Sequence, residues 1–573
     1  MTTFVTSYIS IGDNPEKSTS FVLAKFLEIV KTGIRLCVYT DQSIMHELID
    51  ISNKYSNVII MKQIKIGNAF AFKVCNEIKS LKLPDTDNPR KDTKEYMMLM
   101  NSKIEFVNDA IIQNPWNTNY FAWIDFSIQH VFKTDAYRHK LYELNNLTTT
   151  TKFLAIPGCS QIKDTPDIHN DELQKTFRQI CWRFCGGFFI GDKDNLKNMY
   201  DLYIKYFPIF ISKYKTIVWE VNFWAWLEKN TGWNLNWYKA DHDDSILNIP
   251  YELTSNSLFD VTLKAKYNYP IIDDGIFVPS SMSYIKYKGM HILNTRYVNY
   301  TIRNKKFIHH NPENIIITKN VMSIMNEQLE PISYELMENP TLSETKKSIF
   351  YGIEDIRLFN HSGNLYYMGT SLSHSANDKN SIVIGNYNFK DRTLDSCQTI
   401  ETKYHDSCEK NWTPITCGGE ETLVVYKWFP MEVCSIAENT KLVPKVVYDV
   451  GNEIFRKFRG STTFTKIGDN LIGLVHFSEG EYLERKYFHV LVMLDGYTLQ
   501  PLKYSNHFTF GKESGIEFCT GFAIINMQYT FWVSERDGNP LKITTGIDMI
   551  PLSNTVFFNG YSPVLHLQNG NIV

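Results

Sequence analysis

The second half of the chain repeats one pattern five times. Each unit begins with a polar or charged motif, continues as a short alternating strand, turns, and returns as a second strand. The units begin at Pro279, Glu354, Asn411, Arg459 and Ile516, so that successive starts are 75, 57, 48 and 57 residues apart. Such spacings suit the blades of a β-propeller with loop insertions. The pattern therefore predicts an all-β, five-bladed propeller over residues 265–573.

The polar motifs of these units are expected to converge. In a propeller the same strand position of each blade reaches the same central pocket, so motifs distant in sequence meet there. A purely structural propeller has no need of carboxylates and arginines at these positions. The motifs contribute the following candidates to a shared site: Ser280, Glu354, Asp355, Arg357, Trp412, Arg459, Ser461 and Glu517.

Four basic residues of the same region could hold an anion, either phosphate or a nucleotide diphosphate. They are Arg296, Arg459, His476 and His489. Each can also be an ordinary charge on a strand surface, and that is the preferred interpretation of His489.

Residues 1–250 follow a different, α/β pattern. The segment 3–9 is rich in β-branched and aromatic residues, the segment 22–30 has apolar residues at helical spacing, and 34–41 is an apolar run ending in Asp. Strand patterns recur at 57–64 and 119–126. The order predicts βαβ units and an α/β domain of Rossmann type.

The candidate site residues of this domain lie near the ends of its strands. Asp125 follows an apolar strand, at the sheet edge where open α/β sheets bind ligands, although a single Asp there is often only a helix cap. Gly186 and Gly187 would let a ligand approach the backbone closely. Glu220 lies among aromatic residues of a predicted helix, and His242 follows a strand-like run.

Residues 1–247 resemble the HtrL/YibB family, whose members carry a glycosyltransferase-like GT-A domain. The matching pieces are VTSYIS, FAWIDFSI, GGFFIGD, WEVNFWAWL and YKADHDDSIL. The resemblance implies a nucleotide-sugar donor and a divalent cation, Mn²⁺ or Mg²⁺, on Asp125 and His242. The Asp-x-Asp pattern of GT-A enzymes is incomplete here, because Phe126 and Ser127 follow Asp125. Such cations often use only one or two carboxylates, with phosphate and water oxygens as the other ligands.

Glu220 has two interpretations. It is the candidate for orienting the acceptor hydroxyl or for acting as its base. Alternatively it makes only a structural contact within its helix.

Residues 270–573 resemble the five-bladed mannoside phosphorylases and their mannosyltransferase relatives. The strongest match is GIEDIRLF, in which Ile356 replaces the proline of the family's Glu-Asp-Pro-Arg signature. The resemblance implies that Asp355 is the catalytic carboxylate and that Arg357 binds sugar or phosphate. Acid or base chemistry at a glycosidic centre requires a positioned carboxyl group, which agrees with this assignment.

Composition limits the partners and the location of the protein. The net charge is −3 and the sequence has no basic block, which argues against a nucleic-acid partner. No apolar run approaches the roughly 20 residues of a membrane span, and the first residues do not resemble a signal peptide. The ten cysteines are scattered and form no disulfide framework. We therefore expect a cytoplasmic protein, of open oligomeric state.

These observations lead to one main hypothesis and two alternatives. The main hypothesis is a bifunctional glycosyltransferase, a hexosyltransferase that moves sugars from nucleotide-sugar donors to a glycan acceptor, with the propeller as a mannosyltransferase. In the first alternative the propeller is a glycoside phosphorylase or hydrolase. In the second it is a non-catalytic glycan-binding module.

Overall fold

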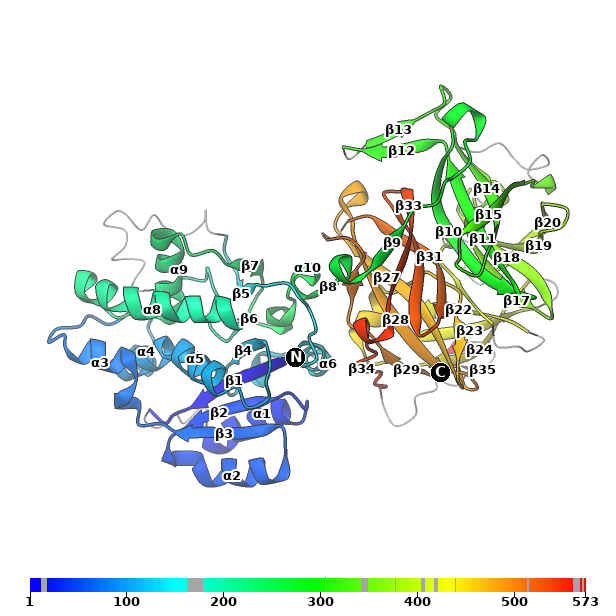
Figure 1. Ribbon diagram of the computed structural model, residues 1–573. Coiled ribbons are helices and arrows are strands. Elements are labelled where there is room, and N and C mark those ends of the chain that lie inside the picture. The colour runs from blue at the N-terminus through cyan, green and yellow to red at the C-terminus, as the bar shows by residue number, and fades with distance from the viewer. Residues whose placement is uncertain are drawn as a thin grey trace. The chain divides into compact units, whose positions relative to one another are not determined.

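The computed structural model divides the chain into two compact units, Met1–Thr254 and Ser255–Val573 (Figure 1). The boundary lies between the two predicted domains, 1–250 and 265–573. The structure describes all residues except 12–17, 162–178, 305, 342–348, 377, 403–407, 417–420, 438–439, 513–514, 560–566, 569–570 and 573.

The first unit is built on a seven-stranded mixed sheet of order β3-β2-β1-β4-β6-β5-β7. Only β6 runs antiparallel to its neighbours β4 and β5. The chain moves outward from β1 to β3 and then returns to the other side of β1 as β4, which creates a switch point between β1 and β4. The strands are β1 (Thr2–Tyr8), β2 (Leu36–Thr40), β3 (Val58–Gln63), β4 (Tyr120–Ile124), β5 (Leu154–Gly158), β6 (Phe188–Asp192) and β7 (Asn236–Lys239).

Helices cover both faces of this sheet, because successive residues of its strands point to opposite sides. Phe4 packs with one group, α1 (Thr19–Val30), α2 (Met45–Lys54) and α6 (Ala136–Asn145). Val5 packs with the other group, α3 (Phe70–Asn76), α4 (Lys94–Asn101), α5 (Lys103–Gln113), α8 (Lys193–Tyr214) and α9 (Glu220–Thr231). The α/β prediction for this half is therefore confirmed.

The second unit is all-β and propeller-like. Four antiparallel sheets share one four-stranded plan, β10-β11-β14-β15, β17-β18-β19-β20, β21-β22-β23-β24 and β31-β32-β33-β9. Their strands are β10 (Val278–Tyr287), β11 (Met290–Val298), β14 (Ile316–Met325), β15 (Pro331–Met337), β17 (Glu354–His361), β18 (Asn364–Ser371), β19 (Ser381–Asn388), β20 (Thr393–Thr399), β21 (Thr413–Ile415), β22 (Thr422–Trp428), β23 (Met431–Ile436), β24 (Leu442–Tyr448), β31 (Glu517–Ile525), β32 (Gln528–Glu535), β33 (Gly538–Gly546) and β9 (Leu263–Ala265).

The prediction of five equivalent blades is wrong in its count. The repeat that begins at Arg459 does not form a four-stranded blade but belongs to an eight-stranded sheet. Its path is β25-β27-β28-β29-β34, and β8, β26 and β30 join it at the side. The strands are β25 (Arg459–Gly460), β26 (Thr465–Ile467), β27 (Asn470–Glu479), β28 (Lys486–Asp495), β29 (Pro501–Tyr504), β30 (Phe508–Thr509), β34 (Asn554–Thr555) and β8 (Asn256–Ser257).

Polar contacts join the first strands of neighbouring sheets. The Thr520 hydroxyl of β31 donates to the carbonyl of Met282 in β10, at 2.7 Å. The backbone amide of Leu358 in β17 donates to the Ser283 hydroxyl of β10, at 2.9 Å. These contacts bring the motifs at the start of β10, β17 and β31 to one region, as a propeller requires.

In the part of the chain that the structure describes, no helix is long and apolar enough to cross a membrane.

Candidate functional site

A bulge at the start of β17 directs the acidic motif of the propeller-like unit. Gly352 has a φ of 112°, and a Cβ at this position would lie 2.4 Å from the carbonyl oxygen of Thr318, so only glycine fits. The pairing of β17 with β18 shifts register between Glu354 and Arg357, and Asp355 takes a left-handed φ of 50°. Bulges of this kind re-aim side chains, and here they set the positions of Glu354 and Asp355.

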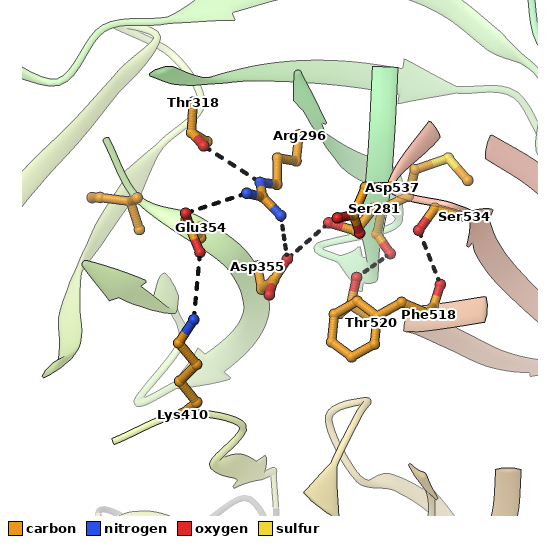
Figure 2. Close-up of polar contacts among 12 residues, drawn as sticks. Ser281, Arg296, Thr318, Glu354, Asp355, Lys410, Phe518, Thr520, Ser534 and Asp537 are labelled. Carbon is orange, nitrogen blue, oxygen red and sulfur yellow. Dashed lines mark hydrogen bonds and ion pairs between the residues drawn. The ribbon is translucent and has the colours of Figure 1, made fainter. Parts of the chain in front are cut away.

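Arg296 of β11 is the centre of the resulting cluster (Figure 2). Its Nη1 donates to Asp355 Oδ1 at 3.1 Å, and its Nη2 lies 3.3 Å from Glu354 Oε1. Asp355 Oδ1 also accepts from the Ser281 hydroxyl at 3.1 Å, and the ammonium group of Lys410 lies 3.9 Å from Glu354 Oε2. Among the described residues, no hydrogen bond or ion pair holds Asp355 Oδ2. The Asp355 side chain as a whole is 18% exposed.

A third carboxyl group, Asp537, lies beside this cluster (Figure 2). It belongs to the turn between β32 and β33, and the Tyr300 hydroxyl donates to its Oδ2 at 3.0 Å. Burial raises the pKa of Asp537, and the negative charge of Asp355 raises it further. Asp537 and Tyr300 were not among the predicted site residues, because the local pattern around Asp537 indicates only a hairpin turn.

The first unit has a comparable cluster around a buried lysine. Lys103, the first residue of α5, places its ammonium group 2.8 Å from Glu220 Oε1 and 3.0 Å from Asp125 Oδ1, and donates to the carbonyl of Gly186 at 2.8 Å. The side chains of Lys103 and Glu220 are 3% and 4% exposed, whereas that of Asp125 is 42% exposed. The lysine was not predicted, because nothing in the pattern of residues 94–112 separates it from a solvated helical charge.

The two glycines of this region lie close to the same carboxylates. A Cβ on Gly186 would lie 2.1 Å from Glu220 Oε1, and one on Gly187 would lie 3.5 Å from Asp125 Oδ2. The structure therefore brings together four predicted residues, Asp125, Gly186, Gly187 and Glu220.

The predicted metal ligands do not fit a metal site as they stand. Asp125 Oδ1 accepts from the indole of Trp123 and pairs with the Lys103 ammonium, whose positive charge opposes a cation there. His242 is exposed on the loop after β7. Over the described ranges, no three His, Cys, Asp or Glu side chains group closely enough to hold a metal ion. A divalent cation on Asp125 and His242 stays a prediction.

Comparison with known proteins gives different results for the two units. Residues 1–220 match a family model described as "Bacterial protein of unknown function (HtrL_YibB)". No curated protein matches the chain.

Three of the solved structures that match the chain have titles that name carbohydrate-active enzymes. A β-1,2-mannobiose phosphorylase from Listeria innocua is 11% identical, with a TM-score of 0.34, over 50% of this chain and 97% of its own. A GH130 structure, reported with hydrolases that target β-1,2 linkages in Candida mannan, is 9% identical, with a TM-score of 0.35, over 48% and 88%. An α-L-arabinanase of Cellvibrio cellulosa is 8% identical, with a TM-score of 0.27, over 47% and 91%. At these values the similarity assigns no activity to this chain.

Arg357 was predicted to bind sugar or phosphate, but its contacts are structural. Its guanidinium is buried and donates to the carbonyls of Asp355, Gly460 and Ser461 and to the side chain of Asn411, at 2.7–3.2 Å. Burial lowers the pKa of Arg357 to about 10. Arg357 therefore fixes the backbone beneath Asp355 instead of facing a ligand.

The predicted ligand-binding residues at and near β25, Arg459, Ser461 and His476, are only partly accessible to a ligand. The Ser461 hydroxyl and His476 Nδ1 are 2.8 Å apart, and both side chains are buried. Burial lowers the pKa of His476 well below its usual value, helped by the nearby His489, Arg357 and Arg459. Of the predicted residues in this motif, only Arg459 is exposed.

Three further candidates are buried. Glu517 accepts from the backbone amides of Phe510 and Gly511, at 2.9 and 2.5 Å, and so anchors a loop. Trp412 is 1% exposed, with its indole bonded to Glu409 at 3.0 Å, and Ser280 is fully buried. The prediction that Glu517 and Trp412 bind substrate is corrected, because their polar groups are used internally and their surfaces are covered.

Proposed function

We propose that the chain is a carbohydrate-active enzyme that transfers a glycosyl group, with Asp355 as the reactive carboxylate of the propeller-like unit. One observation carries this proposal. Asp355 is fixed through Oδ1 by Arg296 and Ser281, while Oδ2 is unpartnered among the described residues and the side chain is partly exposed. A carboxylate held on one oxygen and open on the other suits proton transfer.

The surroundings of Asp355 suit the chemistry of a sugar. Glycosyl transfer passes through an oxocarbenium-like state, and a fixed carboxylate can offset its positive charge or take the proton of the acceptor hydroxyl. Glu354 offers acceptor oxygens to sugar hydroxyls, and Lys410 can contact an anionic group.

The first unit supports a second candidate function, transfer from a nucleotide sugar on a GT-A-like domain. Asp125 stands at the carboxyl end of β4, beside the switch point with β1, where open α/β sheets bind ligands. Its 42% exposed carboxylate and the adjacent Gly187 face the edge at which such a ligand would lie. No step of this reaction is assigned to a metal ion.

Asp355→Asn in the full chain tests the main proposal. The protein is incubated with β-mannobiose, with and without inorganic phosphate, and separately with GDP-mannose or UDP-glucose and a mannoside acceptor. Loss of a positioned acid or base lowers turnover by on the order of 10²–10⁴-fold. The control is Asp274→Asn, because Asp274 is exposed and its left-handed backbone tolerates Asn.

The outcomes separate the candidates. A loss of turnover in Asp355→Asn that the control Asp274→Asn does not show supports the proposal. Equal turnover in both variants contradicts it. Glycan binding by a protein that turns over none of these substrates would leave the non-catalytic binding module.

A further inference from the structure

The turn that carries Asp537 has an unusual backbone for its sequence. Glu535 pairs with Gly538, and the two residues between them, Arg536 and Asp537, have φ values of 53° and 54°. Two-residue turns with both φ values positive normally use Asn-Gly or Asp-Gly, because other side chains are strained there. Such strain persists where surrounding contacts fix it, and it is common at functional sites.

Contacts from other strands fix the Asp537 side chain. Tyr300, at the start of β12 (Tyr300–Arg303), donates its hydroxyl to Asp537 Oδ2 at 3.0 Å. The charges of Asp355 and Arg296 act on Asp537, which places the three groups in one cluster. Asp537 as a whole residue is partly buried.

The two aspartates have opposite electrostatic surroundings. Asp355 forms an ion pair with Arg296, whereas no ion pair to Asp537 exists within the described residues. The pKa of Asp537 is shifted by four neighbouring groups, Arg296 of β11, Asp355 of β17, Tyr300 of β12 and Lys410. The charge of Asp537 in turn raises the pKa of Tyr487 of β28. Burial and the charge of Asp355 raise the pKa of Asp537, and they outweigh Arg296, Tyr300 and Lys410, which lower it.

We propose that Asp537 is the second reactive carboxyl of this site and donates a proton to the leaving oxygen of an O-glycoside. The inference rests on the proposed function. As the C1–O bond breaks, the proton of Asp537 passes to the departing oxygen. The new bond forms between C1 and the oxygen of water or of a sugar hydroxyl, whose proton passes to Asp355. Asp355 then releases its proton to solvent and Asp537 takes one up, so that atoms and charge balance.

This assignment narrows the substrate of the propeller-like unit. A sugar alkoxide is a poor leaving group that needs a proton, whereas a nucleotide diphosphate leaves without one. A carboxyl group whose surroundings raise its proton affinity is typical of a general acid. The substrate is therefore a glycoside or oligosaccharide, and the acid contributes nothing to a nucleotide-sugar donor.

Infrared difference spectroscopy of the full chain at about pH 5 tests the inference without a known substrate, because an aspartate with the ordinary pKa is ionised there. The wild type minus Asp537→Asn difference is expected to show the C=O stretch of a protonated carboxyl group. Asn tolerates the left-handed backbone of residue 537, so this variant should fold. Absence of the acid band overturns the inference, even if Asp355→Asn confirms the proposed function.

Turnover of aryl β-mannosides gives a second measurement. Asp537→Asn should lose at least about 100-fold with a phenyl leaving group but less than about 10-fold with 2,4-dinitrophenyl, which needs no acid. Equal losses on both would overturn the acid role.

Tyr300→Phe removes a hydrogen bond that favours ionised Asp537, so the alkaline limb of the pH profile of kcat/KM should move to higher pH. An unmoved limb would show that Asp537 does not supply the proton.

If the enzyme turns over neither aryl mannoside, the infrared band alone decides. A band that is present in the wild type and lost in Asp537→Asn supports the inference, and a missing band overturns it.

Discussion

Lys103→Met is expected to destabilise the first unit because it leaves a buried carboxylate unpaired. Lys103 is the first residue of α5, where the helix dipole disfavours a positive charge, so the carboxylates around it must account for its position. The ammonium contacts Glu220 at 2.8 Å and Asp125 at 3.0 Å. Met keeps the length of the side chain and removes its charge.

The size of the effect follows from the exposure of the two partners. Glu220 is 4% exposed, and removing the partner of a buried charge costs about 3–5 kcal/mol. Asp125 is 42% exposed, so water can replace the lysine, and this pair contributes at most about 1 kcal/mol. Nearly all of the loss is therefore assigned to Glu220. Asp125→Asn should cost less than about 1 kcal/mol, and adding Glu220→Leu to Lys103→Met should recover most of the stability.

Urea denaturation followed by tryptophan fluorescence measures this loss, since eight of the eleven tryptophans lie in residues 1–254. Burial alone would lower the pKa of Lys103, but Asp125 and Glu220 more than offset it, so the net shift is upward. A raised pKa of a lysine means that its stabilisation is complete below about pH 10 and is lost only above it. The difference between wild type and variant should thus stay constant from pH 6 to 9. A loss below about 1 kcal/mol, or a double variant no more stable than Lys103→Met, would refute the reasoning.

Two further predictions concern the second unit. Glu517→Gln should lower the free energy of unfolding by about 1–3 kcal/mol, because the Glu517 carboxylate accepts hydrogen bonds from the backbone amides of Phe510 and Gly511. Its turnover should stay unchanged, and a loss of turnover without a loss of stability would show that Glu517 belongs to the site. Burial lowers the pKa of His476, so below about pH 6.5 the unfolded chain binds more protons and stability falls as the pH drops, by up to about 1.4 kcal/mol per pH unit. Denaturation of His476→Gln between pH 7 and 5 should show a shallower slope, and an equal slope would contradict this assignment.

The repeat pattern could predict the four regular blades because nearly all of their strands follow one another in the sequence with local alternation. The exception is β9, which joins β33 from residues 263–265. The unit at Arg459 differs because its sheet recruits β8 and β34 from distant segments, a pairing that local alternation does not encode. β25 has only two residues, too few for a strand pattern. The α/β half was predictable for the same reason as the blades, since its elements follow each other in simple alternation.

Of the carboxylates in the candidate site of the second unit, only Glu354 and Asp355, which form a polar motif at a bulge, were predicted from the sequence. Glu354 and Asp355 precede a strand whose register shift turns them toward Arg296. Glu517 is the same residue type at an equivalent strand start, but its carboxylate turns back to its own loop. The direction of such a side chain depends on backbone geometry and on distant partners. For that reason Asp537 and Lys103 could not be found from spacing.

Both clusters place one cation between two carboxylates, yet they differ in what a ligand can reach. In the first unit the lysine and Glu220 are almost completely covered, and only Asp125 is open. In the second unit Glu354 and Asp355 are 15% and 18% exposed, and the third carboxyl group, Asp537, forms no ion pair with any of the described residues. An ion pair lowers the free energy of the charged form, whereas burial without one favours the neutral form. The second cluster therefore combines a proton acceptor with a proton donor, which is the combination that glycosidic chemistry needs.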